Sequence, residues 1–328
     1  MRRLRIALTG TRGVIGSLLA ERLEEDPGCR RLILLDLVPP KRKLRKAVFY
    51  RVDLTDSLAS IRLSEALRRE EPDVVVHLAF LQNPIRNPSY VHELESVGTM
   101  HLLHALADYA GGRRDFGLVV GSSTLVYGAY ADNPNFLSEE APLRGRRGYA
   151  LVQEKVDAER QVAAFRSAFG VPVVVLRAAP VLGPVVRSLA SRYFSLRAVP
   201  TVLGFNPLIQ LLHPEDAVEA YFLALRRLAE DGVSTAYNVA GRGVLPLLAA
   251  IRLIGKRNLP LPGFAATAML DTLFQAGAAI APAAHLDYLR HLCVADCARA
   301  ASELGFMARY SAREAVAAFA RERLQIAA

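Results

Sequence analysis

The sequence predicts an α/β protein with a doubly wound, parallel sheet and a smaller, interleaved second lobe. A short apolar run at residues 4–8 leads through a glycine-rich segment into a segment with apolar residues at helical spacing. Further apolar runs alternate with helical segments along the chain. The runs are continuously apolar, as strands buried on both faces of a parallel sheet are, rather than alternating. The order of strands and helices therefore favours a parallel sheet covered by helices on both faces.

The expected strands occupy residues 4–8, 32–35, 47–52, 74–79, 118–120, 173–176 and 237–239, and the expected helices occupy 57–70, 89–110, 149–168 and 215–229. Residues 180–213 and 241–293 are richer in Pro and Gly and interrupt this alternation. We therefore assign residues 1–179 to the sheet domain and most of 180–328 to the second lobe. The strand at 237–239 is expected to return to the sheet.

Three glycines at offsets of three, Gly10, Gly13 and Gly16, lie between the first strand and the first helix. This arrangement is typical of a dinucleotide-binding loop of the Rossmann type. Gly10 permits the tight turn, Gly13 lets the backbone approach a diphosphate, and Gly16 lets the helix pack closely on the strand. The amino terminus of the helix then offers N–H groups and its positive dipole end to the anion. The remaining loop residues expected at the cofactor are Arg12, Val14 and Ile15.

Polar residues at the ends of the next strands extend this predicted cofactor site. Asp36 ends the second strand, where its carboxylate would accept the adenosine ribose hydroxyls and repel a 2′-phosphate. This favours NAD, whereas Arg12 and the basic run 41–43 leave NADP open as the alternative. Asp53 and Leu54 follow the third strand and are expected at the adenine. Leu78 and Ala79 end the fourth strand and are expected to border the cofactor.

Composition excludes several other classes of protein. The net charge of +9 comes from dispersed Lys and Arg without a groove-reading motif, so we expect no nucleic-acid partner. The three cysteines lack a cluster of His partners, so no metal site is expected. The most apolar stretch, 265–284, contains Asp271, Gln275 and Pro282 and falls short of a membrane span. We expect a cytoplasmic protein that does not bind membranes.

Several motifs in the same order and spacing resemble the extended short-chain dehydrogenases/reductases, the group of the nucleotide-sugar epimerases and dehydratases. They are the segments 9–16, 52–54, 77–79, 98–99, 122–128, Tyr149, 177–184 and 213–217, with Asp296, Arg299 and 304–305 near the end. The resemblance covers almost the whole chain. It implies an NAD(P)-dependent oxidoreductase or epimerase with a small-molecule substrate, such as a nucleotide sugar. By analogy with the family, helices 89–110 and 149–168 would form a homodimer face.

The resemblance also assigns catalytic roles. Ser123 would hydrogen-bond to the reacting oxygen, and Tyr149 would act as the general acid/base and border the cofactor. The family normally has a Lys one helical turn after this Tyr, where the cation lowers the phenol pKa from its ordinary value near 10. Here that position is Gln153, which can hydrogen-bond to the ribose but brings no charge. Lys155 lies about 120° away from Tyr149 around a helix and is expected to face elsewhere.

The expected substrate-binding residues are Ser123, Thr124, Arg177 and Pro180. Arg177 either anchors a substrate phosphate or pairs with a carboxylate of the protein. Two positions depart from the family: Glu95 replaces an Asn, and Pro180 stands where nucleotide-sugar enzymes commonly have an Asn. Three hypotheses therefore remain open. The leading one is a nucleotide-sugar enzyme, the second is a reductase or dehydrogenase of a less polar ketone or alcohol, and the third is a non-catalytic NAD(P)-binding sensor or scaffold.

Overall fold

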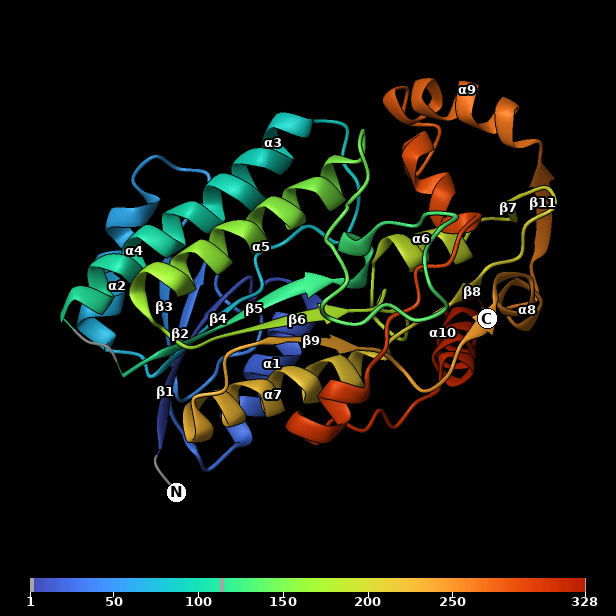
Figure 1. Ribbon diagram of the computed structural model, residues 1–328. Coiled ribbons are helices and arrows are strands. Elements are labelled where there is room, and N and C mark those ends of the chain that lie inside the picture. The colour runs from blue at the N-terminus through green and yellow to red at the C-terminus, as the bar shows by residue number, and fades with distance from the viewer. Residues whose placement is uncertain (1–2, 113–114, 328) are drawn as a thin grey trace.

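The computed structural model describes residues 3–112 and 115–327, without the side chains of 112, 265, 266 and 324–327. Within these residues, seven strands form one sheet in which every neighbouring pair is parallel (Figure 1). From edge to edge they are β3 (Ala47–Arg51), β2 (Cys29–Asp36), β1 (Leu4–Thr9), β4 (Val74–His77), β5 (Gly117–Ser123), β6 (Val173–Ala178) and β9 (Ala236–Val239). The strand order reverses between β1 and β4, which opens a crevice beyond their carboxyl ends.

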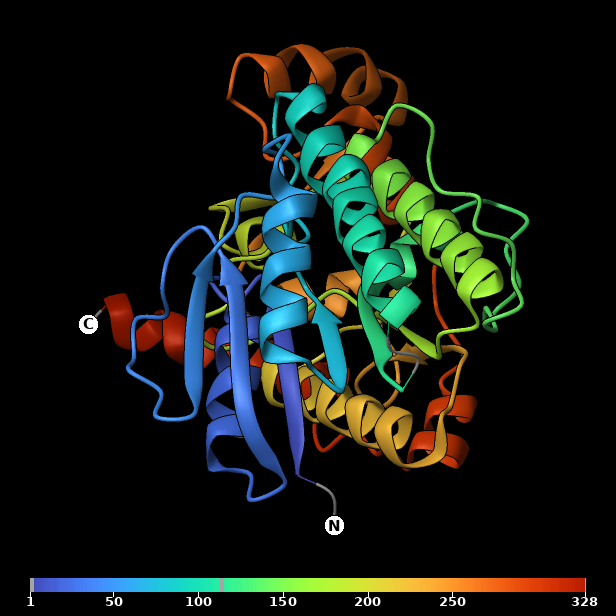
Figure 2. The same ribbon diagram turned by 90° about the vertical axis from the view of Figure 1, so that its left-hand side faces the viewer.

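Helices cover both faces of the sheet, as Figures 1 and 2 show. One face carries α2 (Ala59–Glu70), α4 (Gly98–Gly112) and α5 (Ala150–Phe169), and the other carries α1 (Val14–Glu25) and α7 (Pro214–Asp231). Successive strand residues point to opposite faces, so Ala7 joins the core beneath the first set of helices and Leu8 the core beneath the second. Both residues are fully buried. This two-sided burial is the reason that consecutive residues of β1, from Ile6 to Leu8, are apolar.

A smaller part of the molecule, formed mostly by later residues, lies beyond the carboxyl ends of the strands (Figure 1). Its apolar core includes Phe194, Leu247 and Phe319. Besides α7, the helices that follow β6 are α6 (Leu189–Phe194), α8 (Leu247–Leu253), α9 (Gly263–Gln275) and α10 (Ala312–Ala327), with the shorter turns η3 (Ala283–Leu289) and η4 (Ala300–Leu304). Two small sheets pair β7 (Ala198–Val202) with β11 (Arg257–Leu261) and β8 (Leu208–Ile209) with β10 (Leu245–Pro246).

The seven strands expected from the sequence are confirmed, including the return of 236–239 to the sheet beside β6. The expected helix 89–110 is instead three consecutive segments, α3 (Pro88–His92), the π-helical turn η1 (Glu93–Val97) and α4. The helix expected from 149 begins one residue later, because Tyr149 is its non-helical N-cap with φ −121° and ψ 83°. The division into a domain 1–179 and a lobe 180–328 stays a prediction.

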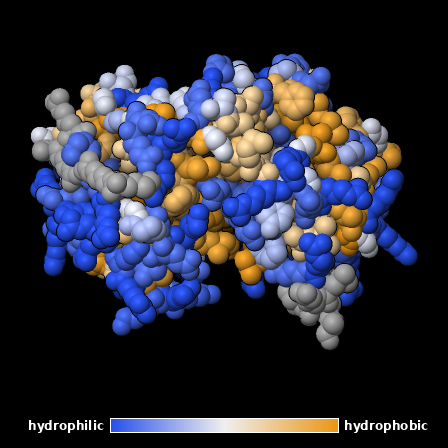
Figure 3. Space-filling model, turned by 90° about the horizontal axis from the view of Figure 1, so that it is seen from below, coloured by the Kyte–Doolittle hydropathy of each residue, from blue (hydrophilic) through white to orange (hydrophobic). Residues whose placement is uncertain are grey.

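The surface is predominantly hydrophilic, but one face shows apolar residues gathered in an indentation near its middle, between two more hydrophilic halves (Figure 3). In the described part of the chain, no helix combines the length and the apolar character needed to cross a bilayer.

Candidate active site

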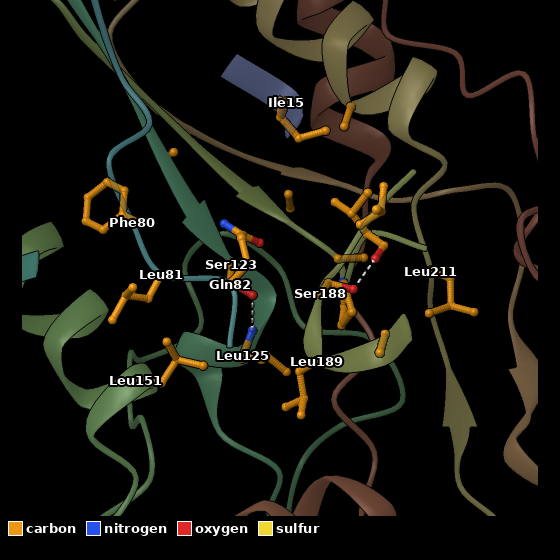
Figure 4. Close-up of a pocket in the computed structure, with 18 of the residues that line it drawn as sticks. Ile15, Phe80, Leu81, Gln82, Ser123, Leu125, Leu151, Ser188, Leu189 and Leu211 are labelled. Atoms are coloured by element: carbon orange, nitrogen blue, oxygen red, sulfur yellow. Dashed lines mark hydrogen bonds between the residues drawn. The ribbon is translucent and has the colours of Figure 1, made fainter. Parts of the chain in front are cut away.

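A cavity of about 400 Å³ lies where the carboxyl ends of β1, β4, β5 and β6 meet the smaller part of the molecule. Ligands of open α/β sheets bind at this edge, next to the reversal of strand order. The glycine loop forms one end of the cavity, the segments after β4, β5 and β6 form its middle, and residues 186–190, 208–211 and 285–293 close it. Figure 4 shows Ile15, Ser123 and Leu189 placed around this space.

The glycine loop has the close contacts that the sequence predicted for it. Gly10 has φ +71°, and a Cβ atom there would lie 2.4 Å from the backbone carbonyl carbon of Leu78. A Cβ on Gly16 would lie 2.3 Å from the carbonyl oxygen of Gly10, which is too close for any side chain. Gly13 is the N-cap of α1 and lines the cavity. The loop residues expected at the cofactor, namely Gly10, Arg12, Gly13, Val14, Ile15 and Gly16, all line it.

Asp36 is held beside this loop by three hydrogen bonds. Its Oδ2 accepts from the backbone N–H of Arg12 at 2.8 Å and from the hydroxyl of Thr11 at 3.3 Å, and its Oδ1 accepts from the N–H of Leu37 at 2.7 Å. These bonds fix the carboxylate at the end of β2, next to the glycine turn. The position suits a ribose diol, and the negative charge disfavours a 2′-phosphate.

Of the four other residues expected at the cofactor, three lie outside the cavity wall. Asp53 Oδ1 accepts from the backbone N–H and the hydroxyl of Thr55, at 2.9 and 2.7 Å, which makes it a turn-forming residue. Leu54 is buried and Ala79 is partly buried in the core beneath α2 and α4, whereas Leu78 lines the cavity. Of these four residues, the geometry therefore places only Leu78 in the cavity wall.

Ser123 ends β5 and lines the middle of the cavity. Its Oγ accepts a hydrogen bond from the backbone N–H of Leu125 at 3.3 Å, so its own hydroxyl hydrogen can be donated to a ligand (Figure 4). Gln82, from the segment after β4, lies near Ser123 and also lines the cavity. Pro180 follows β6 and contributes an apolar ring to the same wall.

The face of α5 that meets the cavity carries Leu151, Val152 and Lys155. Leu151 and Lys155 are four residues apart, about 40° around the helix, and therefore share this face. This is the spacing at which the resembling family has its Tyr and Lys. In this chain, the position one turn before the cavity-lining Lys is a leucine (Figure 4).

The ammonium of Lys155 is fixed by Glu95, which lies in η1. Its Nζ donates to Glu95 Oε1 at 2.7 Å and to the carbonyl oxygen of Leu81 at 3.0 Å. Both side chains are buried, and burial raises the pKa of the Glu95 carboxyl while the ammonium opposes that shift. Glu95 Oε1 also accepts from the backbone N–H of Leu81 at 2.8 Å. The acidic replacement of the family's Asn thus serves as the counter-ion of Lys155.

The structure corrects the expected placement of Tyr149 and Gln153. Tyr149 is fully buried in a cluster with Leu151 and Tyr288, does not line the cavity, and has its phenol pKa raised well above 10 by burial. Gln153 lies against the loop at Gly145 and is also outside the cavity wall. Tyr149 is the non-helical N-cap of α5, so its side chain does not continue the helix face that meets the cavity. That face carries Leu151 and Lys155. The expectation that Lys155 is the one facing away from the site is therefore wrong.

Two of the four expected substrate residues are also placed elsewhere. All three guanidinium nitrogens of Arg177 are engaged by the protein, because Nε and NH2 donate to Glu159 and NH1 donates to the Tyr127 hydroxyl and the Glu139 carbonyl. The structural pairing of Arg177 is therefore the alternative that holds, and its use as a phosphate anchor is corrected. Thr124 is buried outside the cavity wall. Ser123 and Pro180 are the two that line it.

Comparison with known proteins agrees with this fold and loop. A profile of the NAD dependent epimerase/dehydratase family matches residues 6–240. The chain belongs to this family. It is also 30% identical over 318 residues to an uncharacterized protein of Mycobacterium tuberculosis, Rv0501, covering 94% of this chain and 81% of that protein.

Two solved structures share the fold over nearly their whole length. The UDP-glucose 4-epimerase of Thermotoga maritima with UDP-glucose superposes with a TM-score of 0.73 at 19% identity, covering 99% of this chain and 100% of that one. MoeE5, in complex with UDP-glucuronic acid and NAD, superposes with a TM-score of 0.72 at 25% identity, covering 98% and 99%. The chain therefore shares its overall fold with both of these proteins.

The residues of this family member fit the family's cofactor, NAD. The turn at Gly10 and Gly16 leaves no room for side chains, so the backbone N–H groups at the start of α1 stay accessible to a diphosphate. Asp36 lies beside that turn with a fixed carboxylate. Lys155 and Ser123 line the cavity farther along, in the direction in which the nicotinamide half would extend. In the described part of the chain, no cluster of His, Cys, Asp and Glu could hold a metal ion.

Leu151, Tyr288 and His285 are among the residues of the cavity wall that sequence reasoning missed. Leu151 could have been found from the four-residue spacing before Lys155, but the tyrosine at 149 drew the assignment to the wrong helix face. Tyr288 and His285 come from η3, more than 130 residues after α5 begins, and no local motif marks them.

Proposed function

We propose that this family member is an NAD-dependent oxidoreductase whose substrate is a predominantly apolar alcohol or ketone. The observation that carries the proposal is the apolar wall of the cavity beyond Ser123. The apolar side chains there are Leu81, Leu125, Leu151, Val152, Val181, Val186, Leu189, Phe194, Leu211, Leu247 and Leu289. A ligand rich in sugar hydroxyls would place part of its polar surface against these side chains without partners, which is unfavourable.

The glycine loop, Asp36, Lys155 and Ser123 each have a role in this proposal. When bound, NAD accepts a hydride, with its two electrons, from the carbinol carbon of an alcohol while the hydroxyl proton passes to water, and the reverse reaction reduces the ketone. The glycine loop would bind the diphosphate, and Asp36 would bind the adenosine ribose. Lys155 would hydrogen-bond to the nicotinamide ribose, and Ser123 would donate to the reacting oxygen. Tyr149 is not assigned proton transfer, because its phenol does not line the cavity.

A nucleotide-sugar substrate is the second candidate. It is favoured by the ligands named for the two solved structures of the same fold, UDP-glucose and UDP-glucuronic acid, and by the exposed Arg187 in the cavity wall, which could meet a diphosphate. Pro180, which offers no side-chain polar group, and Arg177, whose guanidinium is engaged by Glu159 and by other groups of the protein, weigh against it.

Thermal shift and calorimetry with purified protein separate these candidates. With NAD⁺ present, we expect 2-octanone to raise the melting temperature and 2-octanol to support NADH formation at 340 nm, whereas UDP-glucose does neither. A clear stabilisation by UDP-glucose together with no effect of the octyl compounds would overturn the proposal in favour of the nucleotide-sugar enzyme. Saturable NAD binding without turnover of either class would favour the non-catalytic sensor or scaffold.

We further propose, on the analogy with the family, that α4 and α5 form a homodimer face. These helices pack side by side on one surface of the molecule, as Figure 2 shows. Light scattering after size exclusion tests this, and a monomer at micromolar concentration would contradict it.

A further inference from the structure

The cavity contains a polar ring contributed by the smaller part of the molecule, His285 of η3. The turn is seated by Tyr288, whose hydroxyl donates to the carbonyl oxygen of Leu125 at 2.8 Å. The N–H of the same Leu125 donates to Ser123 Oγ. The rings of His285 and Tyr288 are stacked with centroids 5.8 Å apart. Leu125, which follows β5, therefore links the Ser123 hydroxyl to the turn that carries His285.

The hydrogen bonding of His285 fixes which ring nitrogen carries the proton. The Tyr149 hydroxyl lies 3.3 Å from His285 Nδ1, and the tyrosine is fully buried. Among the described residues, Nδ1 is the one hydrogen-bond partner of this phenol. A buried hydroxyl hydrogen needs an acceptor, so Tyr149 donates to an unprotonated Nδ1. The hydrogen of a neutral imidazole must then lie on Nε2.

The Nε2 atom has no hydrogen-bond partner within the described residues, and it is not among the enclosed, unpaired polar atoms. It therefore keeps accessible surface on a ring that lines the cavity. Burial lowers the pKa of His285 to about 4, so the ring is neutral near pH 7. The titratable groups whose rings contact it are Tyr149 and Tyr288, whose pKa values burial raises, so they are also uncharged near pH 7.

We propose that His285 donates an Nε2–H hydrogen bond to the reacting oxygen of the substrate. The helix position one turn before Lys155 holds Leu151, which has no hydroxyl and cannot make this bond. Tyr149 acts as a positioning residue that fixes the tautomer of His285. The inference rests on the proposed function. A neutral imidazole donor stabilises negative charge that develops on an oxygen without first having to lose or gain a proton. Because His285 lines the cavity, it is the residue that would contact the substrate. Tyr149 does not line the cavity and acts through its hydrogen bond to His285.

Nuclear magnetic resonance of the full chain, labelled with ¹⁵N-histidine, tests the tautomer. We expect the His285 signals of a neutral ring protonated at Nε2, and a change in the tautomer ratio in Tyr149→Phe. The histidine signals that disappear in His285→Gln are those of His285. A ring protonated at Nδ1 in the unsubstituted protein would overturn the inference.

A ketone probe tests the hydrogen bond itself. With NAD⁺ bound, which cannot reduce a ketone, 2-octanone labelled with ¹³C at its carbonyl should show a downfield carbonyl shift. His285→Phe should reduce this shift to the part that the Ser123 hydroxyl contributes, and His285→Gln, which keeps an N–H donor, should retain more of it. Binding of 2-octanone with the same carbonyl shift in His285→Phe overturns the inference and leaves the proposed function intact. No binding of 2-octanone to any of these proteins contradicts the proposed function, and this inference with it.

Kinetics provide a second readout. Loss of one preorganised donor should lower kcat for 2-octanone reduction by about 100-fold in His285→Phe, with a smaller loss in Tyr149→Phe. The Kd for NADH, measured by fluorescence, should stay unchanged in both. An unchanged kcat in His285→Phe would contradict the role of the imidazole.

Discussion

Lys155 Nζ and Glu95 Oε1 lie 2.7 Å apart, in a buried ion pair that joins α5 to the π-helical turn η1. The pair holds an ammonium at the cavity wall, and it exists because an acid occupies position 95. A buried charge without its partner is costly, so each residue depends on the other.

The first prediction concerns the stability of this pair. Glu95→Gln leaves the ammonium buried without a counter-ion and should lower the free energy of unfolding by about 3 kcal/mol, measured by urea denaturation. The double variant Glu95→Gln/Lys155→Met removes both charges and should recover most of that loss. Asp231→Asn, which breaks an exposed pair with Arg227 at 2.8 Å, is the matched control and should cost less than about 1 kcal/mol. Equal losses in Glu95→Gln and Asp231→Asn would contradict this account.

The second prediction separates the two candidate residues for the nicotinamide ribose. In the Glu95→Gln background, Lys155→Met should raise the Kd for NAD about tenfold, because a hydrogen bond from a charged group is lost. Gln153→Met should leave the Kd unchanged, since that side chain lies against the Gly145 loop. Isothermal calorimetry measures both. The reverse pattern would restore Gln153 as the ribose ligand.

The third prediction tests the glycine loop. Gly16→Ala forces a methyl group to within 2.3 Å of the Gly10 carbonyl oxygen, so the turn must open and NAD binding should weaken by at least about tenfold. Gly111→Ala is the control, because that position in α4 has no atom within 4 Å of an added Cβ. Calorimetry should give it an unchanged Kd, with a gain in stability of up to about 1 kcal/mol. Normal NAD affinity in Gly16→Ala would exclude the loop as the diphosphate site.

The fourth prediction concerns cofactor choice. Asp36→Ala removes the carboxylate that Arg12 and Leu37 hold by their backbone N–H groups, and with it the repulsion of a 2′-phosphate. The ratio of Kd for NADP to Kd for NAD should fall by about tenfold or more. NADP binds more tightly because its 2′-phosphate is no longer repelled, and NAD binds more weakly because its ribose hydroxyls lose the carboxylate. Fluorescence titration with NADH and NADPH measures the ratio. A ratio that does not change would place the adenosine ribose elsewhere.

The fifth prediction is a pH dependence of stability. His77 is fully buried between the hydroxyls of Thr9 and Thr99, and burial lowers its pKa from 6.5 to about 3. The unfolded chain takes up this proton below about pH 6.5 and the folded protein does not, so stability present above that pH is lost as the pH falls towards 3.

His77→Asn should therefore remove about 1.4 kcal/mol per pH unit from the slope of unfolding free energy between pH 6 and 4. The difference between the two proteins is the quantity to compare, since carboxyl titrations contribute equally to both. Parallel stability curves would contradict a neutral His77.

The structure agrees most closely with the predictions made from the sequence where a feature depends on residues that are neighbours in the chain. The loop from Gly10 to Gly16, the seven apolar strands and Asp36 at the end of β2 are local patterns, because strand, turn and helix follow one another directly in the chain. Agreement ends at α5. Its sequence offers Tyr149 with Gln153 and Leu151 with Lys155 as pairs at the same spacing, and the residues alone do not say which pair meets the cavity.

The sequence by itself determined the fold class and the dinucleotide loop, since both follow from apolar periodicity and from glycines that backbone geometry requires. Tertiary structure alone decided the chemistry of the cavity wall. It placed the start of α5 after Tyr149, paired Lys155 with Glu95 from another helix, and brought His285 from a turn more than 130 residues away. The physical reason is that helix rotation and long-range contacts are set by packing over the whole core, which no local pattern records.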